Sequence, residues 1–162
     1  MRTVIIENQQ EIEDVIKSCK TCYIGMSDSS GQPYVLPMNF GYADDEFILH
    51  SAPTGRMIDI LKENPKVCIT LCDGDELCWM HEKVACSYRV KSKTIVAEGE
   101  VRFIEDFDEK EQYLHKMMKQ YTDRTFKFGA PAVRNVCIFV VKPANLSAKE
   151  FGATPNTPWV KK

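Results

Sequence analysis

The sequence predicts a mainly β protein with peripheral helices, built as a small closed or split antiparallel β-barrel. Three observations support this fold class. About six short segments have strand-like patterns and are separated by turn-forming residues. One of these segments, residues 87–104, is long enough to bend around a barrel. Helical periodicity is confined to a few segments that lie outside or between the strands.

Length and composition limit the class of protein further. With 162 residues and 44% hydrophobic content, we expect a single domain over residues 1–162. The 21 basic and 23 acidic residues are spread along the chain, so no basic stripe predicts binding to nucleic acid. The N-terminus does not resemble a secretory signal, and no apolar run approaches membrane-spanning length. We therefore expect a soluble, cytoplasmic protein.

The first elements are a helix and a hairpin. Residues 9–20 place apolar side chains at helical spacing and acids in the first turns, which predicts an amphipathic helix. Residues 21–27 are expected to form a strand. The turn DSSGQP follows, in which Gly31 is free to adopt a left-handed conformation, and residues 33–42 form the next strand.

A strand, a helix and another strand follow in quick succession. Two aspartates within residues 43–46 favour a turn, and residues 47–50 continue as a short strand. A short helix is predicted over residues 56–62, and it ends before Pro65 because the residue preceding a proline avoids the helical region. Residues 66–72 return as a strand.

The last elements are two strands around a helix. The long β segment 87–104 carries Gly99 as an expected bulge. Four of its residues share one face: Ile95, Ala97, Val101 and Phe103. Residues 107–121 predict a helix with an acidic start, and residues 134–141 the last strand. No glycine-rich dinucleotide fingerprint follows any strand.

Seven cysteines, an odd number without an export signal, indicate reduced thiols. Cys19 and Cys22 form a CxxC, but they lie where a helix ends, whereas a redox pair lies where a helix begins. Four further residues have ligand types that suit zinc, namely Cys72, Cys78, His81 and Cys86. Because their spacing matches no common zinc knuckle, we expect small buried side chains there and no metal site.

Two segments in the first half of the chain predict a binding site. Ser51, Thr54 and Arg56 surround the start of a helix, where free N–H groups and the helix dipole suit a phosphate. The alternative is that Thr54 only caps the helix and Arg56 faces water. In the preceding strand VLPMNF, Pro37 interrupts the ladder, so backbone groups of residues 38–40 are left to face a flat ligand. The alternative is a protected edge strand.

Several motifs in order give the chain a family resemblance: PYVLPMNFGY, FILHSAPTGR, LKENPKVCITL, CSYRV and VAEGEVRFIEDFDEKEQYLHKMMKQYT. Over residues 15–141 the chain resembles the nitroimidazole-resistance (Nim) branch of the pyridoxamine 5′-phosphate oxidase-like flavin-binding split barrels. The resemblance implies an FMN-binding split barrel that forms a homodimer with the flavin at the subunit interface. Relatives often have lysine where this chain has Met57, and FAD is the alternative cofactor.

The resemblance also implies roles for individual residues. His50 is expected at the active site, as a proton donor or a binding group, against the alternative of a solvent-facing or core histidine. Tyr88 and Arg89 reach the flavin or the partner subunit, unless they form an ordinary surface pair. The cofactor-binding set is Pro37, Met38, Asn39, Phe40, His50, Ser51, Thr54, Arg56, Met57, Tyr88 and Arg89. Trp79 and Trp159 line a substrate cavity or seal the dimer.

The implied activity is two-electron reduction, in which NADH or NADPH reduces the flavin and a small acceptor such as a nitroimidazole or another nitroaromatic takes the electrons. Oxidation of pyridoxamine phosphate is not expected, because the arginine-rich C-terminal motif of that enzyme has no counterpart in NTPWVKK. Two alternatives remain. One is a haem protein in which His50, His81 or His115 ligates iron, and the other is a flavin-binding sensor without turnover.

Overall fold

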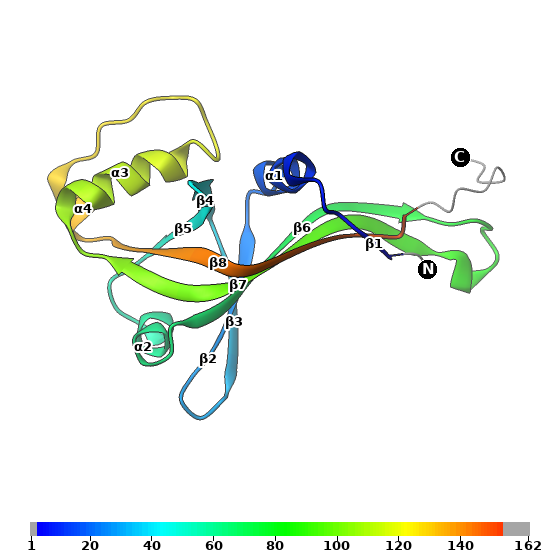
Figure 1. The fold of residues 1–162 in the computed structure, drawn as a ribbon, viewed down its shortest axis with the longest axis horizontal. Helices are drawn as coiled ribbons and strands as arrows, with labels where there is room; N and C mark the ends of the chain where they lie inside the picture. The colour runs from blue at the N-terminus through cyan, green and yellow to red at the C-terminus, as the bar shows by residue number, and fades with distance from the viewer. Residues whose placement is uncertain (1–2, 154–162) are drawn as a thin grey trace.

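All strands between residues 3 and 153, the part that the computed structural model describes, belong to one antiparallel sheet (Figure 1). The strands are β1 Thr3–Ile5, β2 Cys22–Ser27, β3 Pro33–Met38, β4 Phe40–Ala43, β5 Glu46–Ser51, β6 Lys66–Cys78, β7 Arg89–Ile104 and β8 Cys137–Phe151. The helical elements are α1 Gln9–Ser18, α2 Arg56–Glu63, the 3-10 turn η1 Ala85–Ser87, α3 Phe107–Met118 and α4 Ala130–Arg134. None of these helices is long and apolar enough to cross a bilayer.

The strand order shows why the sheet is a split barrel. The order is β3-β2-β6-β7-β8-β5-β4, with β1 paired to β8. β3 and β4 lie at opposite ends of this order, yet only Asn39 separates them in the chain. The sheet must therefore curl until its two ends meet, although no ladder joins β3 to β4. We call this unpaired junction the seam. The predicted split antiparallel barrel with peripheral helices is confirmed.

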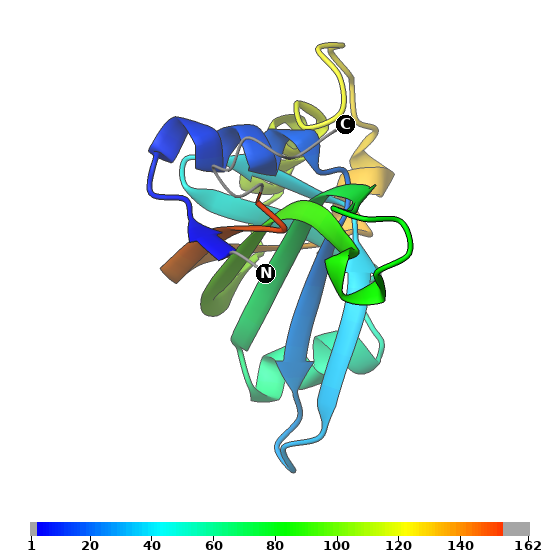
Figure 2. The ribbon, with the colours of Figure 1, turned by 90° about the vertical axis from the view of Figure 1, so that its right-hand side faces the viewer.

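Two helices close the inside of the barrel. α1 lies above the long strands and α2 below them (Figures 1 and 2). α1 begins where the Asn8 side chain accepts the N–H of Glu11 at 3.0 Å, and it buries Ile12, Val15 and Ile16 in the main core. α2 contributes four apolar residues to the same core, Met57, Ile58, Ile60 and Leu61. Both helices therefore form because one apolar stripe is buried in each.

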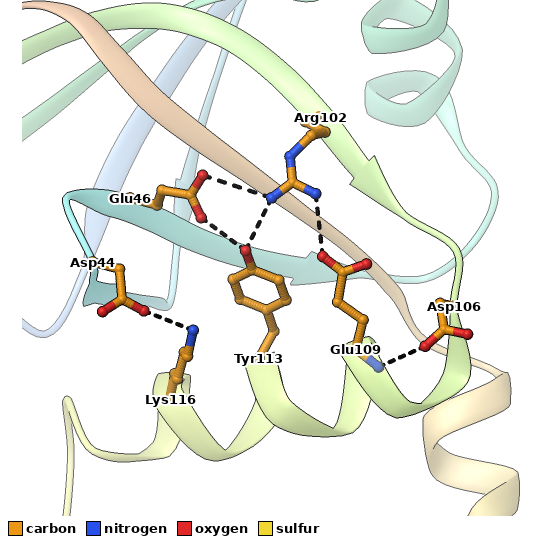
Figure 3. A network of polar contacts seen from close by, with 7 residues as sticks. All are labelled: Asp44, Glu46, Arg102, Asp106, Glu109, Tyr113 and Lys116. Atoms are coloured by element: carbon orange, nitrogen blue, oxygen red, sulfur yellow. Dashed lines mark hydrogen bonds and ion pairs between the residues drawn. The ribbon is translucent and has the colours of Figure 1, made fainter.

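α3 packs on the outside of the barrel, over β5, β7 and β8, and a polar network holds it there (Figure 3). Tyr113 donates its hydroxyl hydrogen to Glu46 at 2.8 Å and accepts a hydrogen bond from Arg102 at 2.9 Å. Arg102 also contacts Glu109 at 3.2 Å, and Lys116 bonds Asp44 at 2.7 Å. The network joins α3 to the β4–β5 turn and to β7.

The strands β6 and β8 are much longer than the pattern predicted, whereas β7, Arg89–Ile104, matches the expected long segment closely. β6 runs six residues past the expected end at Cys72, and β8 extends past residue 141 to Phe151. Polar and turn-forming residues such as Pro143 hid this extension. Pairing with the long β7 overrides their weak strand preference. The register shifts between Glu98 and Gly99, but the unpaired residue is Ala144, so the bulge expected in β7 lies in its partner β8.

Smaller corrections concern element ends and additions. The segment 33–42, expected as one strand, is broken at Asn39, and the third predicted helix ends at Met118 rather than at 121. β1 and α4 were not predicted. Trp159 and the C-terminal NTPWVKK lie outside the described residues.

Candidate functional site

The start of α2 presents backbone donors without a side-chain cap. The N-cap is Gly55, with φ 127°, and not the expected Thr54. This φ favours glycine, which has no side chain with which to cap the helix. The first helical bond runs from the Asp59 N–H to the Gly55 carbonyl at 3.0 Å, so three N–H groups precede it at the positive end of the helix dipole. The geometry suits an anion.

Arg56, the first residue of α2, is held beside this helix start. Its guanidinium lies over the ring of Tyr34 in β3, 4.3 Å from the ring centroid. A cation over an aromatic face is stabilised electrostatically, and stacking leaves the edge of the guanidinium available for hydrogen bonds. Tyr34 was not among the predicted site residues, although strand alternation places it on the same face of β3 as Met38.

The neighbouring predicted residues contribute less through their side chains. The Ser51 hydroxyl donates to the Ala52 carbonyl at 2.8 Å, so its lone pairs, not its hydrogen, are free for a ligand. The Met57 side chain packs in the main core. Its role in the predicted cofactor set is therefore limited to its backbone N–H at the helix start. Thr54 stays exposed beside Gly55.

The seam carries the second group of predicted residues, 37–40. Pro37 and Asn39 are exposed, whereas Met38 packs toward the core and Phe40 is completely buried. Phe40 cannot offer its backbone to a ligand as expected, because the Tyr121 hydroxyl accepts its N–H and donates to its carbonyl, both at 2.8 Å. Since β3 is an end strand, its outer edge next to Pro37 faces away from β2.

His50 lies at the end of β5 but on the other face from Ser51. Phe47 and Leu49 face the main core, while Ile48 joins the cluster beneath α3, and alternation places His50 with Ile48. The imidazole is accessible, yet desolvation by the surrounding atoms lowers the pKa of His50 below its usual value. A neutral imidazole can donate or accept a hydrogen bond at neutral pH.

Tyr88 and Arg89 lie far from these residues in the same chain. They follow η1 at the tip of the β6–β7 hairpin, at the opposite end of the long strands from α2 (Figure 1). Arg89 donates from Nε to the Gly152 carbonyl at 3.0 Å, which ties the hairpin to the end of β8. Within one chain, Tyr88 and Arg89 therefore lie apart from Arg56 and Ser51.

The cysteines do not form a redox or metal site in residues 3–153. All seven are free thiols, and burial raises the pKa of Cys22 to about 12, so this member of the CxxC is inert. No three potential metal ligands are gathered in the described part. The expectation of small buried side chains is wrong for Cys72 and Cys86, which are exposed.

The outer face of β3, β2, β6 and the part of β7 around Glu98 has no helix of residues 3–153 against it, since α1 and α2 pack on the inner side and α3 on the far end. Val35, Gly25, Cys68 and Glu98 are aligned across this face in register. A depression of about 620 Å³ lies over them. The depression is separate from the start of α2 with Ser51 and Arg56, which we call the α2 corner, because neither residue lines it.

Comparison with known proteins now assigns the family. The family model described as pyridoxamine 5′-phosphate oxidase matches residues 9–150. The chain belongs to this family. A crystal structure of a candidate 5-nitroimidazole antibiotic resistance protein from Bacteroides thetaiotaomicron is similar, with 40% identity and a TM-score of 0.82, and the match covers 92% of this chain and 87% of that one. The resemblance to the nitroimidazole-resistance branch is thereby confirmed.

More distant members share the split-barrel fold. The flavocytochrome Anf3 from Azotobacter vinelandii has 18% identity and a TM-score of 0.79, with 94% of this chain and 72% of that one covered. An FAD-binding protein from Mesorhizobium loti has 20% identity and a TM-score of 0.67, with 95% and 100% covered. At these identities the two structures show the fold alone. No curated protein matches the chain.

Proposed function

We propose that the protein is an FMN-dependent oxidoreductase that works as a homodimer, taking electrons from NADH or NADPH and reducing a small acceptor such as a nitroimidazole. The observation that carries the proposal is the α2 corner. Uncapped N–H groups, a glycine with positive φ and the guanidinium of Arg56 form a donor set that fits a phosphate monoester. The exposed Pro37 and Asn39 of the seam are available to a flat ring.

The way in which the predicted residues divide supports the proposed homodimer. Arg56 lies at one end of the long strands, and Tyr88 and Arg89 lie at the other (Figure 1). A second copy packed on the bare outer face would bring the two groups to one flavin. The apolar side chain of Val35 and the half-exposed Tyr23 on that face favour such an interface.

A bound flavin would supply the hydride chemistry, which no side chain in the corner provides. The residues of this chain would bind and orient it: Arg56 and the start of α2 hold the phosphate, and Asn39 faces the ring. His50, whose neutral form is favoured by desolvation, would bind the acceptor through a hydrogen bond from its ring N–H. FAD is accommodated if the corner stays open beyond the phosphate. Similarity to proteins described as flavin-binding supports this assignment.

The test is an FMN titration of the full-length protein, followed by flavin fluorescence. In Arg56→Ala we expect binding to weaken by about 1.5–3 kcal/mol, because charge-assisted bonds to phosphate are lost. This corresponds to a roughly 10- to 150-fold higher Kd. Lys62→Ala, which removes a cation from the last turn of the same helix, is the matched control and should bind FMN like the wild type.

Three other results would contradict the proposal. A Soret band in the purified protein would indicate haem. Bound flavin that remains oxidised under anaerobic NADH and NADPH would indicate a sensor rather than an enzyme. An unchanged titration in Arg56→Ala would remove the α2 corner from the site.

A further inference from the structure

The hairpin that joins β6 and β7, which we call the arm (residues 77–90), exposes an unusual amount of apolar surface. Six of the ten large exposed hydrophobic residues in the described chain belong to it: Leu77, Trp79, Met80, Val84, Tyr88 and Val90. A contiguous apolar surface of this kind marks an interaction site rather than an ordinary loop. The arm lies at the end of the molecule, away from α2 (Figures 1 and 2).

Internal hydrogen bonds fix the conformation of the arm. Ser87, a buried polar residue, accepts the N–H of His81 at 3.2 Å and donates to the His81 carbonyl at 2.8 Å. The Tyr88 hydroxyl donates to the Glu82 carbonyl at 2.8 Å, and the Lys83 N–H donates to Nδ1 of His81 at 3.2 Å. An exposed loop with this much internal bonding is preorganised, which lowers the entropy cost of binding.

The arm presents an aromatic face. The rings of Trp79 and Tyr88 are stacked, with centroids 5.4 Å apart and planes inclined by 17°. Tyr88 covers one face of the indole, and its own position is fixed through Glu82. Trp79 nevertheless keeps 46% of its surface exposed. The result is a rigid, electron-rich ring that can stack with a planar, electron-poor ligand.

The outer face continues onto the arm. Leu77 and Val90 are paired, and alternation along β7 puts Val90 on the same face as Val96 and Glu98. An interface through the outer face therefore includes the arm. When two copies pack around a two-fold axis that runs across the long strands, the arm of each copy meets the α2 end of the other.

We propose that Trp79, supported by Tyr88, forms the acceptor-binding wall of the site on a second copy of this chain, and that it selects planar, electron-poor aromatic acceptors such as nitroheterocycles by stacking. The inference rests on the proposed flavin site. It adds a binding residue for the acceptor and assigns that residue to the other subunit. Arg56 and Trp79 of one chain would then serve two different flavins.

The first experiment measures acceptor binding without turnover. The oxidised FMN-loaded protein is titrated with 2-methyl-5-nitroimidazole by calorimetry. We expect Trp79→Ala to raise the acceptor Kd about tenfold and Trp79→Phe to raise it less than about threefold, because phenylalanine preserves a stacking face. Val84→Ala, another exposed apolar position of the arm, is the matched control. The Kd for FMN should be unchanged in all three variants.

A mixed-dimer experiment tests the assignment to the second copy. Arg56→Ala chains lack the flavin corner, and Trp79→Ala chains lack the wall. After unfolding and refolding as an equal mixture, half of the dimers are mixed, and each mixed dimer contains one intact composite site. We therefore expect about one quarter of the wild-type number of tight acceptor sites. Neither variant alone should have any.

The outcomes separate the two proposals. Wild-type acceptor affinity in Trp79→Ala would overturn the role of Trp79 while leaving the flavin site intact. No recovery of sites in the mixture would show that the arm serves its own chain, which overturns the assignment to a second copy. Failure of the wild type to bind FMN at all would instead overturn the proposed function, on which this inference depends.

Discussion

Tyr121 joins β4 to the segment before β2, beside the seam, and removing its hydroxyl tests how the barrel is held together there. The hydroxyl accepts the Phe40 N–H at 2.8 Å and shares its hydrogen between the carbonyls of Phe40, at 2.8 Å, and Lys20, at 3.0 Å. Tyr121→Phe therefore removes the accepted bond and the one bond that the shared hydrogen can make at any moment, about two bonds in all. It also leaves the Phe40 N–H without its partner. At about 1 kcal/mol for each bond, with the added cost of an unpaired group, we expect a loss of roughly 2–3 kcal/mol in the free energy of unfolding.

The assay is urea unfolding followed by circular dichroism, supported by a thermal melt. The expected loss corresponds to a Tm lower by roughly 4–12 °C for a chain of this size. Tyr88→Phe removes the same group where it makes one exposed bond, to the Glu82 carbonyl, so it should cost less than about 1 kcal/mol. If Tyr121→Phe costs no more than Tyr88→Phe, this hydroxyl does not hold the barrel together beside the seam, and our account of this contact is wrong.

Two further predictions concern packing and protonation. A Cβ at Gly41 would lie 2.5 Å from the Met117 Cα, so Gly41→Ala should lower the free energy of unfolding in urea by roughly 2–3 kcal/mol. Gly25→Ala is the control and should be tolerated, because the nearest contact of its Cβ would be at 3.5 Å. Equal costs for the two variants would contradict the close approach of α3 to β4. Because desolvation lowers the pKa of folded His50, the unfolded chain binds a proton first as the pH falls through about 6.5. The free energy of unfolding should therefore fall more between about pH 7.5 and 5 in the wild type than in His50→Gln, and an equal fall in both would refute the desolvation.

Local patterns predicted the elements where local physics decides the structure. The double aspartate turn is one example, since Asp44 and Asp45 have φ values of 53° and 61°, in the left-handed region that aspartate tolerates. The end of α2 before Pro65 is another. The same reasoning failed for the extension of β8, because its residues become a strand only through pairing with β7. Partner-dependent strands carry little signal of their own.

The candidate site was predictable to the extent that it lies in one continuous segment. Ser51, Thr54 and Arg56 are close in sequence, so their meeting at a helix start follows from the order of the elements. The contacts of Arg56 with Tyr34 and of Phe40 with Tyr121 join residues that are far apart in the chain. Periodicity assigns a side chain to a face but does not name its partner across the barrel.

The proposed division of the site between two ends of one chain would explain why sequence reasoning gave Tyr88 and Arg89 no firm role. A residue whose function requires another copy has no partner within its own chain, and by local criteria it resembles a surface residue. The arm nevertheless differs from ordinary surface in two physical respects. It exposes six large hydrophobic residues, and hydrogen bonds within the arm hold it in one conformation. The internal hydrogen bonds stabilise the hairpin even in water, whereas exposed apolar side chains become favourable only when another surface covers them. The proposed second copy would provide that surface.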